Sequence, residues 1–555
     1  MTVMCLLVRG HTRTRNAKVF SNIAYQKRKS DKPEPSPKVT NIQRDSAVNI
    51  ETKNVDTKPV VNKTFVPFYE MLLRRRDEAR RSILMEIEGL QDAGRVKQFC
   101  TKIGPVKHCF FYRRPGKNFV LVEFQTAVSK MKTMENSYDS KDPQSIPVFS
   151  PFLYFQSDPQ SGRSQALTDL TEDIQCKEQA ALKELKDLQC SSKNRLRMEM
   201  DHLYKKSKIS DLSIRLRYFT CHQLDLALEG LFRDVKALPF GSTVSGFGRN
   251  SGDLDIYLHF KKNLCQVIKD DTSKLFFHSK SWVRDKSMQL KLISDLISLL
   301  LPGCTNVVSI LGARVPIIKY HQIMTNVECD IQNSSAAGVD TSHILYTMNK
   351  WDLRVAPLVY SLRLWAAQNN ITCVKKPSPY ITNFSLMLMV IFFLQTEQIL
   401  PSLHSFSRLP TTLTSSSFDP DAELFFPDLR RVEKGLLSGG NEEKIDSLLV
   451  KFFMFYSTFS FEKNKISVYH GKVMPKSSRL ILEIENPTNP SLNVAKNVRP
   501  EYLQVFQIAA REAAKVLGER EFQSKSLLDV IPLTRHDMNG SVQERGNRNR
   551  NANNN

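Results

Sequence analysis

Short apolar runs and helical periods alternate along the chain from residue 65 onward. The stretch from residue 65 to 88, "FVPFYEMLLRRRDEARRSILMEIE", predicts a helix that runs into a strand. The next residues predict a helix, a strand, the turn "PGKN", another strand and a further helix, ending near residue 136. Beyond residue 342 the pattern is mostly helical, and the longest apolar run, "LMLMVIFFL" at 386–394, predicts a buried helix. This run is too short to cross a bilayer, so we expect no membrane insertion.

The strand–helix–strand–strand–helix order of residues 65–155 is that of an RNA-recognition-motif-like (RRM-like) domain. Its RNA-contacting strand would be "KNFVLVEF", in which Phe119 and Phe124 fit the aromatic pattern but Leu121 replaces a base-stacking aromatic. Two alternatives follow. The sheet binds RNA weakly, or it packs against protein, for which a second subunit is one candidate.

Two acidic residues alternate with apolar ones in "GDLDIYLHF". Period two places Asp253 and Asp255 on one face of a strand, with Leu254 and Ile256 behind them. Two carboxylates this close repel each other unless a divalent cation lies between them, which favours Mg²⁺ or Mn²⁺. Acids on an exposed strand are common, so this spacing alone leaves a chance arrangement open.

A Gly-Ser pair precedes these acids. Gly241 permits close backbone approach, and the amides with the Ser242 hydroxyl can hold a terminal phosphate. "GFGRNSG" is not a dinucleotide loop, because it leads into a strand, and no Gly-Lys-Ser or Gly-Lys-Thr follows to make a Walker loop. A two-metal site needs a further carboxylate, which Asp330 in the strand-like "VECDI" can supply.

Four blocks in this order carry a family resemblance: "PFGSTVSGFGRNSGDLDIYL", "RVPIIKY", "NFSLMLMVIFFLQ" and "IENPTNPSLNVAKNV". Together they resemble the atypical poly(A) polymerases and terminal uridylyltransferases of the DNA polymerase β-like nucleotidyltransferases, and among these the mitochondrial group. The resemblance covers residues 65–520 and implies an α+β fold, with a nucleotidyltransferase palm and a helical poly(A)-polymerase-associated domain after the RRM-like domain. It also implies a homodimer formed through residues near 65–155, which suits a sheet that lacks a full base-stacking surface.

The resulting domain boundaries combine this resemblance with composition. They are a mitochondrial transit peptide (1–45), a linker (46–64), the RRM-like domain (65–155), a charged, solvated connecting helix (156–208), the palm (209–340), the helical domain (341–520) and a disordered tail (521–555).

The resemblance also assigns roles to residues. Asp253 and Asp255 would hold both metals, and Asp330 would bind the catalytic metal and help to activate the attacking hydroxyl. Gly241 and Ser242 would contact the triphosphate. The other predicted nucleotide-binding residues are Ser342, Arg363, Asn383, Phe384, Asn486, Asn489, Leu492 and Asn493. Without the family context, Phe384 would be an ordinary core aromatic.

Three positions depart from the family pattern. Leu492 stands where uridylyltransferases often have a histidine that narrows the pocket, so the resemblance favours ATP as substrate. Asn486 and Asn489 stand where acids are common, although an amide can both donate and accept. Ala367 replaces a usual cation near the phosphates, for which Lys350 is a possible substitute.

The chain carries 79 basic and 57 acidic residues among 555, a net charge of +22, which favours a nucleic-acid partner. The first thirty residues hold no acid and several Arg and Lys, which favours import into the mitochondrial matrix. A disordered basic tail or a nuclear localisation signal in "QKRKS" are the alternatives. The ten cysteines form no zinc or disulfide pattern.

The sequence thus predicts a template-independent enzyme that adds AMP from ATP to the 3′ ends of mitochondrial RNA by a two-metal mechanism. One alternative is a cytoplasmic or nuclear terminal uridylyl- or adenylyltransferase. Another, from a different class, is a non-catalytic RNA-binding scaffold.

Overall fold

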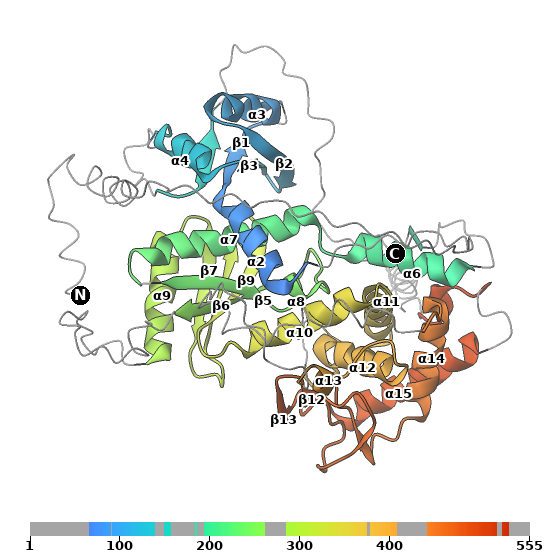
Figure 1. Ribbon diagram of the computed structural model, residues 1–555. Helices are drawn as coiled ribbons and strands as arrows, with labels where there is room; N and C mark the ends of the chain where they lie inside the picture. The colour runs from blue at the N-terminus through green and yellow to red at the C-terminus, as the bar shows by residue number, and fades with distance from the viewer. Residues whose placement is uncertain are drawn as a thin grey trace, which may run out of the picture. The chain divides into compact units, whose positions relative to one another are not determined.

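The computed structural model describes residues 66–89, 91–138, 149–156, 184–185, 194–232, 234–260, 285–373, 378–407, 441–518 and 524–531 (Figure 1). The predicted transit peptide and linker, most of the predicted connecting segment, and residues 532–555 lie outside these ranges.

The first sheet contains the elements that the apolar pattern predicts, in the same order. Helix α2 (Phe68–Arg80) leads into β1 (Ser82–Ile87), and the remaining elements are α3 (Asp92–Ile103), β2 (Val106–Arg114), β3 (Lys117–Phe124) and α4 (Ala127–Glu135). A fourth strand, β4 (Phe152–Phe155), completes the spatial order β2-β3-β1-β4. A right-handed β3–α4–β4 unit would set β4 antiparallel to β1. Here β4 pairs parallel to β1, so the last strand departs from the RRM pattern.

The two faces of this sheet pack against different helices. One face forms a core with α3 and α4, to which Val96, Cys100 and Met134 contribute. The other face packs against α7 (Asp211–Glu229), and the Tyr112 hydroxyl donates to the carbonyl of Met324 at 2.8 Å. The second face contains the predicted base-stacking positions; its core consists of Leu84, Tyr112, Phe119 and Leu121 with Leu212, Leu216 and Phe219 of α7. The sheet therefore packs against protein, and that protein is the same chain.

Leu121→Ala is expected to lower the free energy of unfolding by about 2–5 kcal/mol, because Leu121 is 1% exposed under α7 and truncation leaves a cavity. RNA affinity per folded molecule should not change. Denaturant unfolding and fluorescence anisotropy with labelled RNA measure the two quantities. Leu73→Ala is the matched control, because Leu73 is 47% exposed and its truncation should cost little. Weaker RNA binding at unchanged stability would contradict this account.

The palm is built on a second sheet with the strand order β5-β6-β9-β8-β7. Its strands are β5 (Val235–Phe240), β6 (Leu254–Phe260), β7 (Cys304–Ile310), β8 (Ile317–Gln322) and β9 (Val327–Gln332). β6 and β9 run parallel at the centre, and the other pairs are antiparallel. Helices α7 and α9 (Lys286–Leu300) contribute to the core on one side of this sheet. The predicted alternation in β6 is confirmed, since Leu254, Ile256 and Leu258 are fully buried.

The helical region follows the palm. Its helices are α10 (Ala337–Trp351), α11 (Val355–Gln368), α12 (Asn383–Thr396), α13 (Leu403–Ser407), α14 (Ile445–Thr458) and α15 (Pro500–Leu517), with short strands β10 (Asn464–Lys465), β11 (Met474–Pro475), β12 (Glu485–Asn486) and β13 (Asn489–Asn493). Every residue of α12 from Ser385 to Gln395 is buried, as predicted. No helix in the described ranges is both long and apolar enough to cross a membrane.

Two predictions about segments that pack onto this helical region are wrong. Helix α6 (Arg195–Ser207), assigned to a solvated connecting helix, buries Leu196, Met200 and Leu203 in the helical core. Residues 524–531, assigned to a disordered tail, include the 3-10 helix η6 (Leu527–Asp529) and dock onto α6. Leu527 N–H donates to Glu199 Oε2 at 2.6 Å, and the Ser526 hydroxyl donates to the same carboxylate at 2.9 Å. Arg195, four residues earlier, also pairs with Glu199, but the sequence gives no sign of the partners at 526 and 527 that lie far along the chain.

Candidate active site

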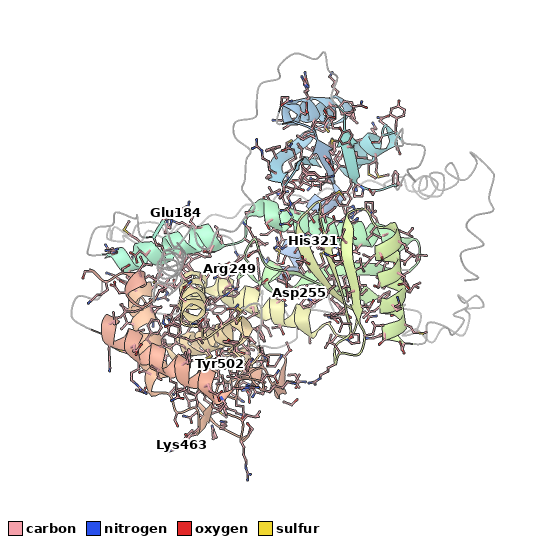
Figure 2. All side chains as sticks on the ribbon, turned by 180° about the vertical axis from the view of Figure 1, so that it is seen from behind. Glu184, Arg249, Asp255, His321, Lys463 and Tyr502 are labelled. Carbon is pink, nitrogen blue, oxygen red and sulfur yellow. The ribbon has the colours of Figure 1, made fainter. Side chains whose placement is uncertain are left out.

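The sheet register brings the three predicted acids together. Asp255 on β6 lies directly opposite Asp330 on the parallel neighbour β9, and Asp253 immediately precedes β6. Period two puts Asp253 and Asp255 on the same face, and the buried Leu254 and Ile256 fix that face away from the core. Asp255 lies on the part of the palm sheet next to α10 (Figure 2). Three carboxylates therefore share one small region of the sheet.

The electrostatics of this region favour cation binding. Burial, followed by the charges of Asp330 and Asp253, raises the pKa of Asp255 to about 7. Desolvation and the charge of Asp330 also raise the pKa of Asp253. Lys319 on β8 pairs in register with Asp330, and its Nζ lies 2.7 and 2.6 Å from Oδ1 and Oδ2 of that carboxylate. Lys319 and Arg217, whose charge acts on Asp253, thus face three carboxylates, which leaves an excess of negative charge.

The donor set fits a hard divalent cation. Mg²⁺ and Mn²⁺ prefer carboxylate oxygens, and all three side chains supply them on adjacent strands. In the described part of the chain, no group of three His, Cys, Asp or Glu residues is arranged as a ready-made metal cage. The Lys319 ammonium lies on both oxygens of Asp330, where a cation would otherwise bind.

A glycine turn packs directly against these acids. Gly241 has φ +73°, and a Cβ at this position would lie 2.4 Å from Oδ2 of Asp255. The Gly241 N–H donates to Ser342 Oγ at 2.7 Å, and the Ser342 hydroxyl donates to the carbonyl of Gly338. The turn leads into the short helix α8 (Ser242–Ser245). Glycine is needed here for both its conformation and its lack of a side chain.

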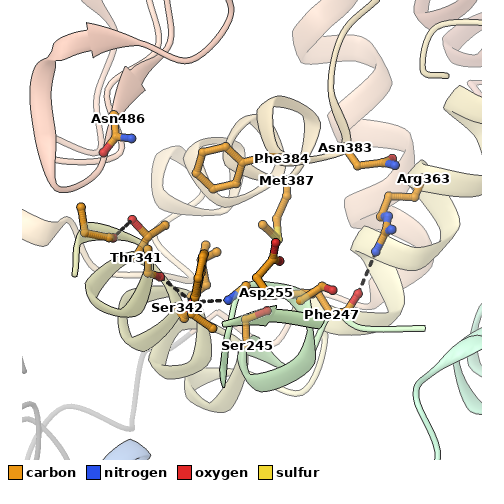
Figure 3. Close-up of a pocket in the computed structure, with 16 residues that line it drawn as sticks. Ser245, Phe247, Asp255, Thr341, Ser342, Arg363, Asn383, Phe384, Met387 and Asn486 are labelled. Carbon is orange, nitrogen blue, oxygen red and sulfur yellow. Dashed lines mark hydrogen bonds between the residues drawn. The ribbon is translucent and has the colours of Figure 1, made fainter. Parts of the chain in front are cut away.

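A cavity of about 420 Å³ opens beside this turn, between the palm and α10–α12 (Figure 3). This volume lies within the range of small-molecule sites. Half of the sixteen residues that line it carry polar or charged side chains, and the others are apolar or glycine: Phe240, Gly241, Ser242, Ser245, Phe247, Asp255, Ala337, Gly338, Thr341, Ser342, Leu345, Arg363, Asn383, Phe384, Met387 and Asn486. Asp255 thus belongs both to the acidic cluster and to the cavity wall.

The cavity brings together many of the predicted residues that the sequence holds far apart. Gly241, Ser242, Ser342, Arg363, Asn383, Phe384 and Asn486 all line it. Arg363 is oriented by a 2.8 Å hydrogen bond from Nη1 to the carbonyl of Phe247. Asn486 Oδ1 accepts from the backbone N–H groups of Thr488 and Asn489, which holds its loop at the cavity edge.

The other predicted nucleotide-binding residues do not line the cavity. Asn493 braces its own loop, because Oδ1 accepts from Ile484 and Ala495 N–H and Nδ2 donates to the carbonyl of Leu482. Asn489 accepts from Ser491, and Leu492 is partly buried outside the lining. Nucleotide contacts by these three residues stay predictions.

Lys350 does not take the place of the cation that Ala367 lacks. Its Nζ lies 5.6 Å from the ring centre of Tyr346, and Lys350 is not among the residues that line the cavity.

Sequence reasoning missed Lys319 and several residues that shape the cavity. In "VPIIKY", the burial of Ile318 and Tyr320 places Lys319 on the acidic face, but only the β8–β9 register reveals its partner. Phe247, Leu345 and Met387 line the cavity with side chains that are equally typical of a core, so the sequence contained no signal for them.

The acidic cluster, the Gly-Ser turn and the adjoining cavity are the features of a nucleotidyltransferase, and comparisons with known proteins agree. The family "Poly(A) RNA polymerase, mitochondrial-like, central palm domain" matches residues 196–350, and "Cid1 family poly A polymerase" matches residues 444–495. The mitochondrial poly(A) RNA polymerase of Drosophila melanogaster is 30% identical over 480 residues, which cover 83% of this chain and 77% of that protein. The Homo sapiens protein is 29% identical, with 84% and 79% covered.

A solved structure shows the same relationship. The crystal structure of mtPAP in complex with ATPγS superimposes with a TM-score of 0.71 at 27% identity and covers 82% of this chain and 96% of that one. The chain belongs to the family of mitochondrial poly(A) RNA polymerases.

Proposed function

We propose that this chain is a template-independent poly(A) polymerase that transfers AMP from ATP to RNA 3′ ends in mitochondria. The observation that carries the proposal is the placement of Asp255. It belongs to a cluster of three carboxylates and also lines a nucleotide-sized cavity beside Arg363 and Phe384. Metal-assisted phosphoryl transfer needs these two features to meet.

Asp253, Asp255 and Asp330 would hold Mg²⁺ or Mn²⁺, which when bound would lower the pKa of the RNA 3′-hydroxyl and neutralise charge on the triphosphate. The Gly241 turn would place the Ser242 hydroxyl and nearby amides against the terminal phosphates. Ser342 acts through this turn, because its hydroxyl fixes the Gly241 N–H.

The remaining cavity residues would position the nucleotide. Phe384 is partly buried at the start of α12, where one ring face can stack on a base. Arg363 would face the phosphates from α11. Asn486 would donate from Nδ2 to the base, since its Oδ1 is already occupied by the backbone of its loop.

ATP is the proposed substrate because Leu492 stands where uridylyltransferases often have a histidine that narrows the pocket. Leu492 lies outside the cavity lining, so this choice of base rests on the family resemblance. Related mtPAP structures contain ATPγS, UTP, GTP or CTP, so occupancy of a site does not by itself identify the substrate of this chain. Selection has to be measured in the reaction.

The test is extension of an RNA primer by the full chain with each ribonucleotide in turn, in Mg²⁺ and in Mn²⁺. We expect kcat/KM for ATP to exceed that for UTP by about 10-fold or more, since one pocket contact discriminates by about 1–3 kcal/mol. Leu492→His should lower this ratio, and Leu480→His, on an exposed leucine, is the control. Preference for UTP would contradict the base assignment, and no incorporation of any nucleotide would favour the scaffold alternative.

We further propose that RNA is held mainly through backbone phosphates by the basic excess, that the protein acts in the mitochondrial matrix, and that it is a homodimer. The RRM-like domain would contribute to dimerisation through a surface other than the face under α7, which is already covered. Light scattering that gives a monomer mass at micromolar concentration would contradict the dimer. A reporter fused to residues 1–50 that stays diffuse in the cytoplasm would contradict import.

A further inference from the structure

Lys319 is held over the acidic cluster by the strand that carries it. Its neighbours Ile318 and Tyr320 are 0% and 1% exposed, so they fix one face of β8 in the core and turn Lys319 to the other. In the antiparallel register Lys319 lies directly opposite Asp330. Its Nζ reaches both carboxylate oxygens, at 2.7 and 2.6 Å.

This ion pair uses the same oxygen atoms that a divalent cation would need. Asp330 is the nearest of the three acids to β8. The pKa of its neighbour Asp255 is raised to about 7 by burial and by the charges of Asp330 and Asp253. Without any cation near Asp330, the three carboxylates would repel one another at close range. The pairing of β8 with β9 places the positive charge of Lys319 beside Asp330, where it reduces this repulsion.

We propose that Lys319 is a positioning residue that acts as an internal counter-cation: it neutralises Asp330 while the site is free of metal, and it leaves that carboxylate when a divalent cation binds. Lys319 thereby sets the metal concentration at which the site fills. The inference rests on the proposed metal-dependent function, and it concerns the affinity of the site for the metal rather than the chemical step.

The chemistry of lysine suits such an exchange. The ammonium is a point charge on a flexible stem with rotatable donors, and the side chain is 46% exposed, so it can move into water at small cost. An ion pair with this exposure contributes little net stability. A divalent cation bound by several carboxylates therefore displaces Lys319 from Asp330. Because the ion pair has to be broken first, the site binds the cation less tightly than it would if Asp330 had no lysine partner.

Mn²⁺ binding to the full chain tests the proposal. Titration followed by the electron paramagnetic resonance of free Mn²⁺ gives the affinity, and thermal unfolding with EDTA or Mn²⁺ gives a second readout. We expect Lys319→Met and Lys319→Gln to bind Mn²⁺ about 5- to 10-fold more tightly than the unmodified protein, which is the effect of removing about 1 kcal/mol of competing ion pair. In EDTA both variants should melt lower, and Mn²⁺ should raise their melting temperature by more. Lys319→Arg should stay close to the unmodified protein.

The matched control is Lys291→Met. Lys291 forms an exposed pair with Asp295 on α9 at 2.6 Å, so its loss removes a similar ion pair outside the acidic cluster and should leave Mn²⁺ affinity unchanged. If the Lys319 variants bind Mn²⁺ no more tightly, or more weakly, the proposal is wrong and Lys319 only orients Asp330. If the unmodified protein binds no Mn²⁺ and extends no primer, the proposed metal-dependent function is wrong, and with it the role of Lys319 that rests on it.

Discussion

Replacing Asp330 by asparagine is expected to slow RNA extension by at least about 10³-fold while the chain stays folded. The substitution keeps the shape of the side chain and removes the charge that would bind the catalytic metal, a contribution of several kcal/mol to the transition state. Lys319 loses its ion pair but is 46% exposed, so water can solvate it. The free energy of unfolding should therefore change by less than about 1 kcal/mol. Single-turnover extension and denaturant unfolding measure the two effects.

Asp295→Asn is the control for this experiment. Asp295 also pairs with a lysine at 2.6 Å, but on the exposed surface of α9. Both activity and stability should stay near those of the unmodified protein. An Asp330→Asn variant that extends RNA at the normal rate would remove Asp330 from the metal site and return the pair of acids on β6 to a chance arrangement.

Gly241→Ala is expected to lower extension by about 10²-fold or more. Gly241 has φ +73° and ψ −143°, a region essentially restricted to glycine, so alanine costs about 1–3 kcal/mol there, and its Cβ would lie 2.4 Å from Oδ2 of Asp255. The carboxylate would have to move, and misplacement of a reacting group by about 1 Å can cost 10²-fold in rate. The variant should also lose about 1–3 kcal/mol of stability. Primer extension and thermal unfolding follow the two losses.

The Gly116→Ala variant distinguishes the cost of a positive φ from the effect of the contact with Asp255. Gly116 has the same φ of +73° in the turn between β2 and β3, but a Cβ there meets no atom within 4 Å. Its alanine variant should share the backbone cost and keep full activity. Equal activity of the two alanine variants would show that the approach of Gly241 to Asp255 has no part in the reaction.

Local patterns in the sequence predicted local structure well. The hairpin of β2 and β3, the alternation in β6 and the buried helix α12 each follow from the spacing of apolar residues within one segment. The family resemblance also predicted eight of the sixteen residues that line the cavity, and six of these eight lie within the four blocks.

What the sequence did not predict depends on partners far along the chain. The spacing of apolar residues in β3 placed Phe119 and Leu121 on one face of the sheet, but it did not show that α7 packs against that face. Lys319 could be placed on a strand, whereas its ion pair with Asp330 requires the register between β8 and β9. Charged residues on α6 suggested a solvated helix, because Ser526 and Leu527, which bury and satisfy Glu199 together with the nearby Arg195, lie more than three hundred residues away.

That last contact bears on how the chain completes its fold during synthesis. Helix α6 leaves the ribosome early, but the backbone N–H of Leu527 and the hydroxyl of Ser526 that satisfy Glu199 are among the last described groups to be made. Until they are made, the fully buried Glu199 carboxylate has its ion pair with Arg195 but lacks these two donors, so the helical core gains part of its stability only at the end of synthesis. A message cut short just before codon 524 would yield a protein that keeps Asp253, Asp255 and Asp330 but lacks two of the groups that satisfy Glu199.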